Sequence, residues 1–98
     1  MKIYIAGKIT GLTEEEYTEK FSNATLVLMD NGVTVVNPVI ICSGLDESNT
    51  WKEYMDICLF NLIRCDSIYM LNNWFDSKGA RVEYAVAKEL GLKIMSEE

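Results

Sequence analysis

Short runs of apolar residues alternate along the chain with longer segments in which apolar residues recur at helical spacing. Residues 2–6, 33–36, 67–71 and 92–95 are rich in β-branched and aromatic side chains, which predicts four strands. Helical spacing is carried by Tyr17, Phe21, Ala24 and Leu28, and then by Trp51, Met55, Cys58, Leu59 and Leu62. A third helix is expected over residues 78–90, ended by Gly91. The predicted order is therefore βαβαβαβ.

The ends of the first helix carry recognisable capping residues. Thr13 followed by Glu16 matches a capping box, so the helix is expected to begin there and to run to about Asp30. Asn31-Gly32 would stop it, because glycine suits the left-handed cap. The second helix is expected to end at Arg64-Cys65. Residues 39–50 and 72–76 are expected to be connections.

Strands that alternate with helices of ten or more residues imply right-handed crossovers and a parallel sheet. The continuous apolar run at 33–36 is typical of a sheet covered on both faces. We therefore expect an α/β, Rossmann-like three-layer sandwich with four or five parallel strands, formed by residues 1–98 as a single domain. Ligands of such sheets bind outside the carboxyl ends of the strands, which makes residues 7–11, 37 onward and 72–83 the candidates.

Composition narrows the possible functions. The 98 residues carry a formal net charge of −6, which disfavours a partner made of duplex nucleic acid. No apolar run approaches the length of a membrane span, and three cysteines without a CxxC pair suit a reducing cytoplasm. The chain has no histidine, so Ser-His and Cys-His mechanisms are excluded and a metal site is not expected. A chain this short is expected to gain stability as a homodimer.

Two loops contain residues that suit an anion. Glycines in Gly7-Lys8-Ile9-Thr10-Gly11 let the backbone approach a phosphate, although the sequence fits a plain tight turn as well. Ser77 is the expected N-cap of the third helix. There its hydroxyl and the amides near Gly79 lie at the positive end of the helix dipole and can bind an anion. Glu83 follows in an apolar stretch of the same helix. From periodicity alone, a solvated position for Glu83 is slightly favoured over a buried one.

Three segments taken together resemble the nucleoside 2-deoxyribosyltransferase-like superfamily. They are Tyr4-Ile5-Ala6-Gly7-Lys8-Ile9-Thr10-Gly11, Cys65-Asp66-Ser67-Ile68-Tyr69-Met70-Leu71, and Ser77-x-Gly79-x-x-x-Glu83 with Ala85, Ala87 and Leu90-Gly91 after it. They cover most of the chain in the order found in that superfamily. The chain is most similar to its short phage and bacterial branch and to deoxynucleoside-monophosphate N-glycosidases, which implies a flavodoxin-like fold.

The resemblance implies a chemistry and a set of site residues. Members cleave or exchange the N-glycosidic bond of a nucleoside or nucleotide through a glutamate nucleophile, without a cofactor. Glu83 stands at the position of that nucleophile and Tyr4 at the position of the tyrosine that orients it. Gly7, Lys8, Ile9, Thr10 and Gly11, with Ser77 and Gly79, stand where a phosphate is held. Trp51 and Trp74 are candidates for stacking on the base, and helix or dimer packing is an equal alternative for both.

One position departs from the superfamily pattern. Members generally carry an aspartate near the departing base, and the aligned residue here is Cys58. Asp56 lies about 200° away around the helix and is expected to face elsewhere. A thiol is a poor proton donor, and a buried core position is the favoured interpretation of Cys58. Two functions thus stay open: an N-glycosidase or deoxyribosyltransferase, and a weak or inactive nucleotide-binding module, such as a phage protein that sequesters a nucleotide signal. A third alternative is a structural or adaptor domain whose pocket is vestigial.

Overall fold

The computed structural model describes residues 1–30 and 32–97. It contains the strands β1 (Lys2–Ala6), β2 (Thr34–Val36), β3 (Ser67–Met70) and β4 (Lys93–Ser96). Its helices are α1 (Glu14–Leu28), α2 (Pro38–Ile41), α3 (Trp51–Leu62) and α4 (Lys78–Glu89), with a 3-10 turn, η1 (Trp74–Asp76). The strands form one parallel sheet in the order β2-β1-β3-β4, which confirms the predicted α/β class.

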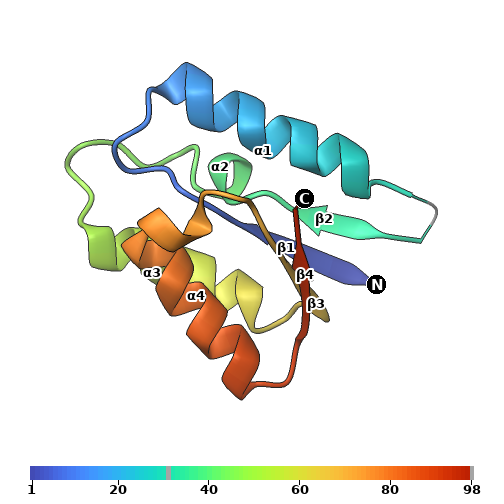
Figure 1. Ribbon diagram of the computed structural model, residues 1–98. Helices are drawn as coiled ribbons and strands as arrows, with labels where there is room; N and C mark the ends of the chain where they lie inside the picture. Colours follow the sequence, from blue (N-terminus) through green and yellow to red (C-terminus); the bar gives the residue numbers. More distant parts are fainter. Residues whose placement is uncertain (31, 98) are drawn as a thin grey trace.

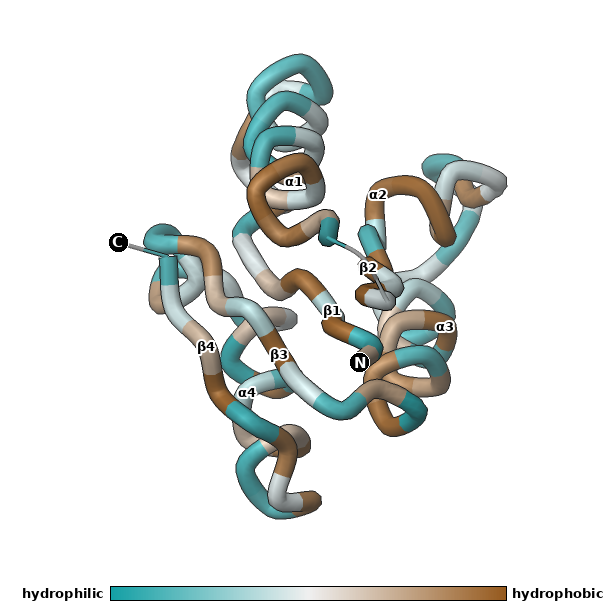
Figure 2. The backbone as a smooth tube through the Cα atoms, turned by 90° about the vertical axis from the view of Figure 1, so that its right-hand side faces the viewer, coloured by the Kyte–Doolittle hydropathy of each residue, from teal (hydrophilic) through white to brown (hydrophobic). Residues whose placement is uncertain are grey.

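Helices cover both faces of the sheet, as the apolar strands predicted. Figure 1 shows α1 above the sheet and α3 with α4 below it, and the side view in Figure 2 shows the same layers. Alternate residues of β1 point to opposite faces. Ile3 and Ile5 pack with Phe21 on the α1 side. Tyr4 and Ala6 pack on the side of α3 and α4.

The chain reverses its direction of winding at β1. From β1 the sheet continues to β2 on one side and to β3 on the other, so the connections after these strands diverge. Such a switch point opens a crevice outside the carboxyl ends of the strands. Here β1 ends at Ala6 and its neighbour β3 ends at Met70, two residues that are paired in the sheet. The loop after β1 and the segment that leads into α4 therefore lie at this edge.

Several element boundaries differ from the sequence predictions. Helix α1 ends at Leu28, because Met29 already has extended backbone angles, rather than near Asp30. Gly32 has the left-handed φ of 80° that was expected of it, and Asn31 lies outside the described residues. Helix α3 ends at Leu62 rather than at Arg64-Cys65. Strands β2, β3 and β4 and helix α4 each differ from the predicted ranges by one residue at one or both ends.

The expected connections hold two elements that the sequence analysis missed. Residues 39–50 contain most of α2, which begins with Pro38 in the first turn and is capped by Asn37, whose Oδ1 accepts from the Val39 amide at 3.0 Å. Residues 72–76 contain η1. Both elements are shorter than the roughly two turns needed for helical periodicity to show in a sequence. They shape the cavity described below, because α2 leads directly into its wall.

Candidate active site

A cavity of about 1100 Å³ opens at the carboxyl edge of the sheet, where the first turns of α3 and α4 meet the loop after β1. Each helix is capped there by its own side chain: Thr50 Oγ1 accepts from the Glu53 amide at 3.1 Å and Ser77 Oγ from the Ala80 amide at 3.1 Å. The lining includes Gly7, Ile9, Thr10, Glu14, Cys42, Asp46, Glu47, Trp51, Tyr54, Asp76, Ser77, Lys78, Gly79, Arg81 and Glu83.

Glu83 is a buried carboxylic acid at the wall of this cavity. Its side chain is 5% exposed, and the hydroxyl of Tyr4 on β1 donates a hydrogen bond to its Oε2. Burial raises the pKa of Glu83 to about 8, and the Tyr4 hydrogen bond opposes part of that rise. The slightly favoured expectation of a solvated Glu83 is thus wrong. Ala80, Glu83 and Ala87 are the buried residues of α4, and their spacing by three and four residues is the sequence pattern that could have revealed it.

Near Glu83 lies a cluster of thiols and hydroxyls formed by Cys42, Cys58, Tyr4 and Tyr54. Cys42 and Cys58 are both buried, with their Sγ atoms 3.8 Å apart. Burial raises the pKa of both thiols, and the nearby Glu83 raises them further. Burial likewise raises the pKa of Tyr4 and Tyr54, with Glu83 and Cys58 contributing. All four groups therefore keep their protons near neutral pH.

Cys58 is fully buried in the core on the side of α3 and α4, as the favoured interpretation had it. Asp56 is exposed, which agrees with the prediction that it faces away from Cys58. Tyr54 lies one turn before Cys58 on α3 and reaches the cavity lining, which Cys58 does not. The sequence analysis did not select Tyr54 or Cys42, although the spacing of Tyr54 from Cys58 places both on one helix face.

The loop after β1 contributes only part of its predicted set. Gly7, Ile9 and Thr10 line the cavity, whereas Lys8 and Gly11 are not in the lining. The amide of Lys8 donates to Asn73 Oδ1 at 3.1 Å, which ties this loop to the one after β3. A Cβ on Gly7 would lie 2.5 Å from Cδ1 of the buried Leu71, so glycine is required there by the close approach of two loops.

Three of the four candidates near the beginning of α4, namely Ser77, Gly79 and Trp51, lie together in the cavity lining, and Trp74 does not. Ser77 and Gly79 line the cavity beside Trp51 of α3. A Cβ on Gly79 would contact Met55 Sδ at 3.3 Å and Trp51 Nε1 at 3.8 Å, so the small residue lets the two helices approach. Trp74 is placed differently: its ring stacks on Tyr84, with centroids 4.8 Å apart, and it lies outside the lining.

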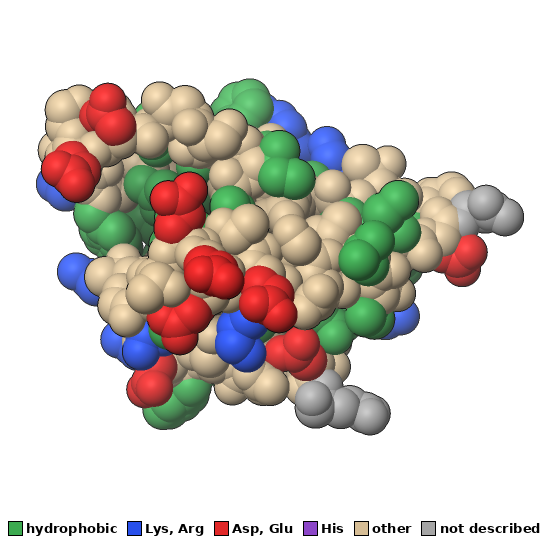
Figure 3. Space-filling view, turned by 90° about the horizontal axis from the view of Figure 1, so that it is seen from above, with side chains coloured by type: hydrophobic (Ala, Val, Ile, Leu, Met, Phe, Trp, Pro, Cys, Tyr) green, Lys and Arg blue, Asp and Glu red, His purple; other side chains and the backbone are tan. Residues whose placement is uncertain are grey.

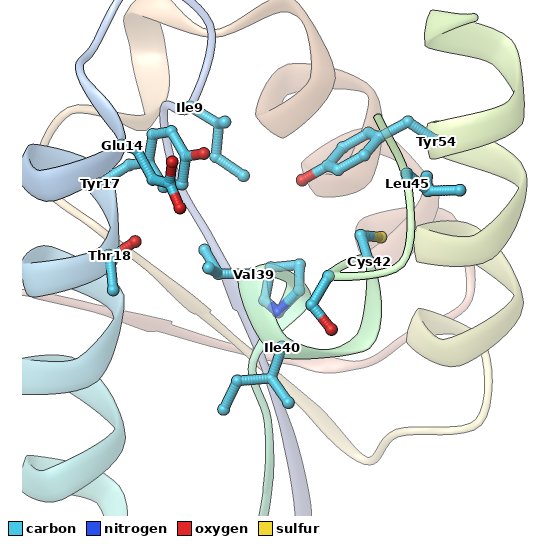
Figure 4. Close-up of a pocket in the computed structure, with 11 residues that line it drawn as sticks. Ile9, Glu14, Tyr17, Thr18, Val39, Ile40, Cys42, Leu45 and Tyr54 are labelled. Carbon is cyan, nitrogen blue, oxygen red and sulfur yellow. The ribbon is translucent and has the colours of Figure 1, made fainter. Parts of the chain in front are cut away.

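A second hollow of about 510 Å³ adjoins the first between α1 and α2. Tyr17 and Tyr54 lie on opposite sides of it and their side chains point toward each other (Figure 4). Cys42, Leu45 and Ile9 line both spaces, which makes them one continuous trench. Within the described part of the chain, no three or more Cys, Asp or Glu side chains gather closely enough to hold a metal ion.

The fold is that of the nucleoside 2-deoxyribosyltransferase-like class of proteins. The structure is similar to that of a 2-deoxyribosyltransferase from the psychrotolerant bacterium Bacillus psychrosaccharolyticus, with a TM-score of 0.74 and 25% sequence identity over 98% of this chain and 71% of the other. The chain belongs to the family described as a domain of unknown function, DUF4406, whose model matches residues 1–96.

A comparison with curated proteins found no match. None of the helices formed by residues 1–30 and 32–97 is long and apolar enough to cross a membrane.

Proposed function

We propose that this protein binds a nucleoside or nucleotide and cleaves or exchanges its N-glycosidic bond, with Glu83 as the nucleophile. The observation that carries the proposal is the carboxyl group of Glu83, buried at the wall of an open cavity and held by the hydroxyl of Tyr4. The similarity to a 2-deoxyribosyltransferase supports the same chemistry.

Glycosyl transfer passes through a state with positive charge on the sugar, which a carboxylate stabilises and then traps as a covalent ester. Glu83 in its ionised form would attack C1′, and water or a second base would resolve the ester. The Tyr4 hydroxyl would fix the orientation of the carboxylate. Ser77, Gly79 and the cavity-lining part of the loop after β1 would hold the sugar and any 5′-phosphate through backbone amides and hydroxyls.

A second candidate is a binding module that holds a nucleotide without turning it over. The observation that favours it is Cys58, which stands at the position of the usual aspartate and is buried behind the cavity with its pKa raised by burial. Such a site binds but has no ready proton for a departing base. A phage protein that sequesters a nucleotide signal would be one use of it.

Base release separates the two candidates. Purified protein is incubated with each deoxynucleoside and deoxynucleoside monophosphate, and free base is measured by chromatography. Glycosidase activity predicts release that is lost in Glu83→Gln, which keeps the size and hydrogen-bonding capacity of the side chain. Tight binding in calorimetry without release would support the binding module instead. Absence of both release and binding would refute a function on deoxynucleosides and their monophosphates.

We also propose that the protein works in the cytoplasm as a homodimer. Three free cysteines suit a reducing compartment. Large apolar side chains such as Leu26, Val27 and Ile40 are exposed in the isolated chain, and a second copy would cover some of them. Sedimentation equilibrium tests the assembly: a mass near twice 11.1 kDa is expected, and a monomer at high concentration would refute it.

A further inference from the structure

We propose that the preferred substrates of this site are nucleosides or nucleotides whose base is a cation, such as a pyridinium or an N7-alkylpurinium. The inference rests on the proposed function and narrows its substrate class. It follows from three features of the cavity. Apart from Glu83, which must lose its own proton to act as the nucleophile, its wall has no thiol or phenol that readily gives a proton to a departing base. Its charged groups are mainly acidic, and within residues 1–30 and 32–97 no cation pairs with its buried carboxyl group.

The first feature is the lack of a proton donor for the leaving group. A neutral base departs easily only if it is protonated as the glycosidic bond breaks. The chain has no histidine, and Cys58 stands behind the lining. Cys42 and Tyr54, a thiol and a phenol of the wall, hold their protons tightly because burial raises the pKa of each. A cationic base leaves as a neutral molecule and needs no proton.

The second feature is the charge of the cavity lining. Besides Glu83, four carboxylic acids line it against two cationic side chains: Glu14, Asp46, Glu47 and Asp76 against Lys78 and Arg81. Figure 3 shows acidic side chains on both sides of a hollow at the left of the molecule. The two cations are already engaged, because Lys78 Nζ lies 4.5 Å from the centre of the Trp51 ring and Arg81 donates to the Phe75 carbonyl at 2.7 Å. The cavity therefore favours a positively charged ligand.

The third feature is the state of Glu83. Burial raises its pKa, the hydrogen bond from Tyr4 lowers it in part, and no positive side chain is among the causes. A nucleophilic carboxylate must be ionised, and an opposite charge within a few ångströms favours that form. A cationic base bound beside Glu83 would supply that charge. The same substrate thus ionises the nucleophile and removes the need for an acid.

The bonds and charges balance in two steps. The Glu83 carboxylate forms a bond to C1′ while the C1′–N bond breaks. The electron pair of the C1′–N bond stays on the base, which leaves as a neutral molecule. Water then forms a bond to C1′, the bond between C1′ and the Glu83 oxygen breaks, and one proton passes to solvent. The products are the neutral base, the free sugar and the regenerated carboxylate, with no oxidant or metal required.

Matched substrate pairs test the inference. Nicotinamide riboside is compared with its reduced, uncharged form, and 7-methylguanosine with guanosine, each with a buffer blank for spontaneous hydrolysis. Nicotinamide mononucleotide and the four deoxynucleosides complete the set, so that the phosphate and the sugar are varied separately. The readout is free base and kcat/KM. We expect the cationic member of each pair to react at least tenfold faster, and Glu83→Gln to abolish the difference.

A charge variant tests the acidic lining directly. Glu14→Gln with Glu47→Gln removes two charges from the exposed lining, and Glu15→Gln with Glu19→Gln removes two from exposed positions of α1 outside it. The first pair should raise KM for the cationic substrates about threefold at low salt, less at high salt, and the second should not. Equal or faster release from the neutral members, lost in Glu83→Gln, would overturn this inference and leave the proposed function standing. Release from none of the compounds would overturn both.

Discussion

Burial of Glu83 should make the free energy of unfolding fall as pH rises, and a single substitution at this position should remove that dependence. The pKa of Glu83 rises from an ordinary 4.5 to about 8 in the folded protein. The folded state thus binds the proton more tightly than the unfolded state. This contribution to stability is complete below pH 4.5 and is lost as pH rises through 8. At about 1.4 kcal/mol per pH unit the full loss is about 5 kcal/mol, a large share of the 5–15 kcal/mol typical of a domain.

Glu83→Gln removes this titration and keeps a hydrogen-bonding partner for Tyr4. Urea unfolding is followed by circular dichroism at pH 5.5, 6.5, 7.5 and 8.5 under reducing conditions. The free energy of unfolding of the variant, minus that of the wild type, should grow by about 3 kcal/mol over this range and level off above pH 8. Glu89→Gln, the same change at an exposed position of α4, is the control. A difference for Glu83→Gln that stays constant with pH would refute a buried, protonated Glu83.

Other predictions concern activity and packing. In the proposed mechanism the ionised form of Glu83 attacks, so kcat/KM should rise with pH to a plateau above about pH 8, and a falling profile would contradict its role as the nucleophile. Tyr4→Phe removes the hydrogen bond that lowers this pKa, so the rise should move to higher pH and the rate at pH 7 should fall about tenfold or more. Gly7→Ala should cost about 1–3 kcal/mol of unfolding free energy, because its Cβ meets Leu71, and thermal unfolding measures it. Cys58→Asp should cost about 3 kcal/mol or more in the same assay by burying a second carboxyl near Glu83.

Apolar periodicity identifies the elements of this fold but not their ends. The four strands and three long helices follow from runs such as 67–71 and from the capping box at Thr13, whose two hydrogen bonds are both present. Periodicity missed α2 and η1, because four and three residues are too few to repeat. Their positions depend instead on local hydrogen bonds, such as the cap from Asn37, that compete with other turn geometries.

The chemical environment of the site is harder to read from sequence than its position. The topology places the end of β1 and the beginning of α4 at one edge, so Tyr4 and Glu83 could be brought together by argument from the sheet alone. Burial of Glu83 was harder to predict. Residues 82, 84 and 86 are also apolar or aromatic, so the face formed by Ala80, Glu83 and Ala87 was one of two that periodicity allowed. The proximity of Cys42 to Cys58 depends on α2, which the sequence does not reveal. For Trp74 the sequence left base stacking and packing open, because its stacking on Tyr84 is a tertiary contact that periodicity does not reveal.

A buried carboxyl group without a cation is costly, and its cost bears on function. Ionisation of the buried Glu83 costs free energy, and a positive group in the cavity offsets that cost. The group can be a sugar that develops charge at C1′ or a base that already carries it. A carboxylate already paired with lysine or arginine would gain less from either. Cys58 also leaves Glu83 as the group that a cation would pair with. A thiol adds no charge at neutral pH, whereas an aspartate at this position would compete with Glu83 for the same cation. In the proposed mechanism the cavity thus stabilises one positive charge beside Glu83, and a base that leaves without taking up a proton suits it best.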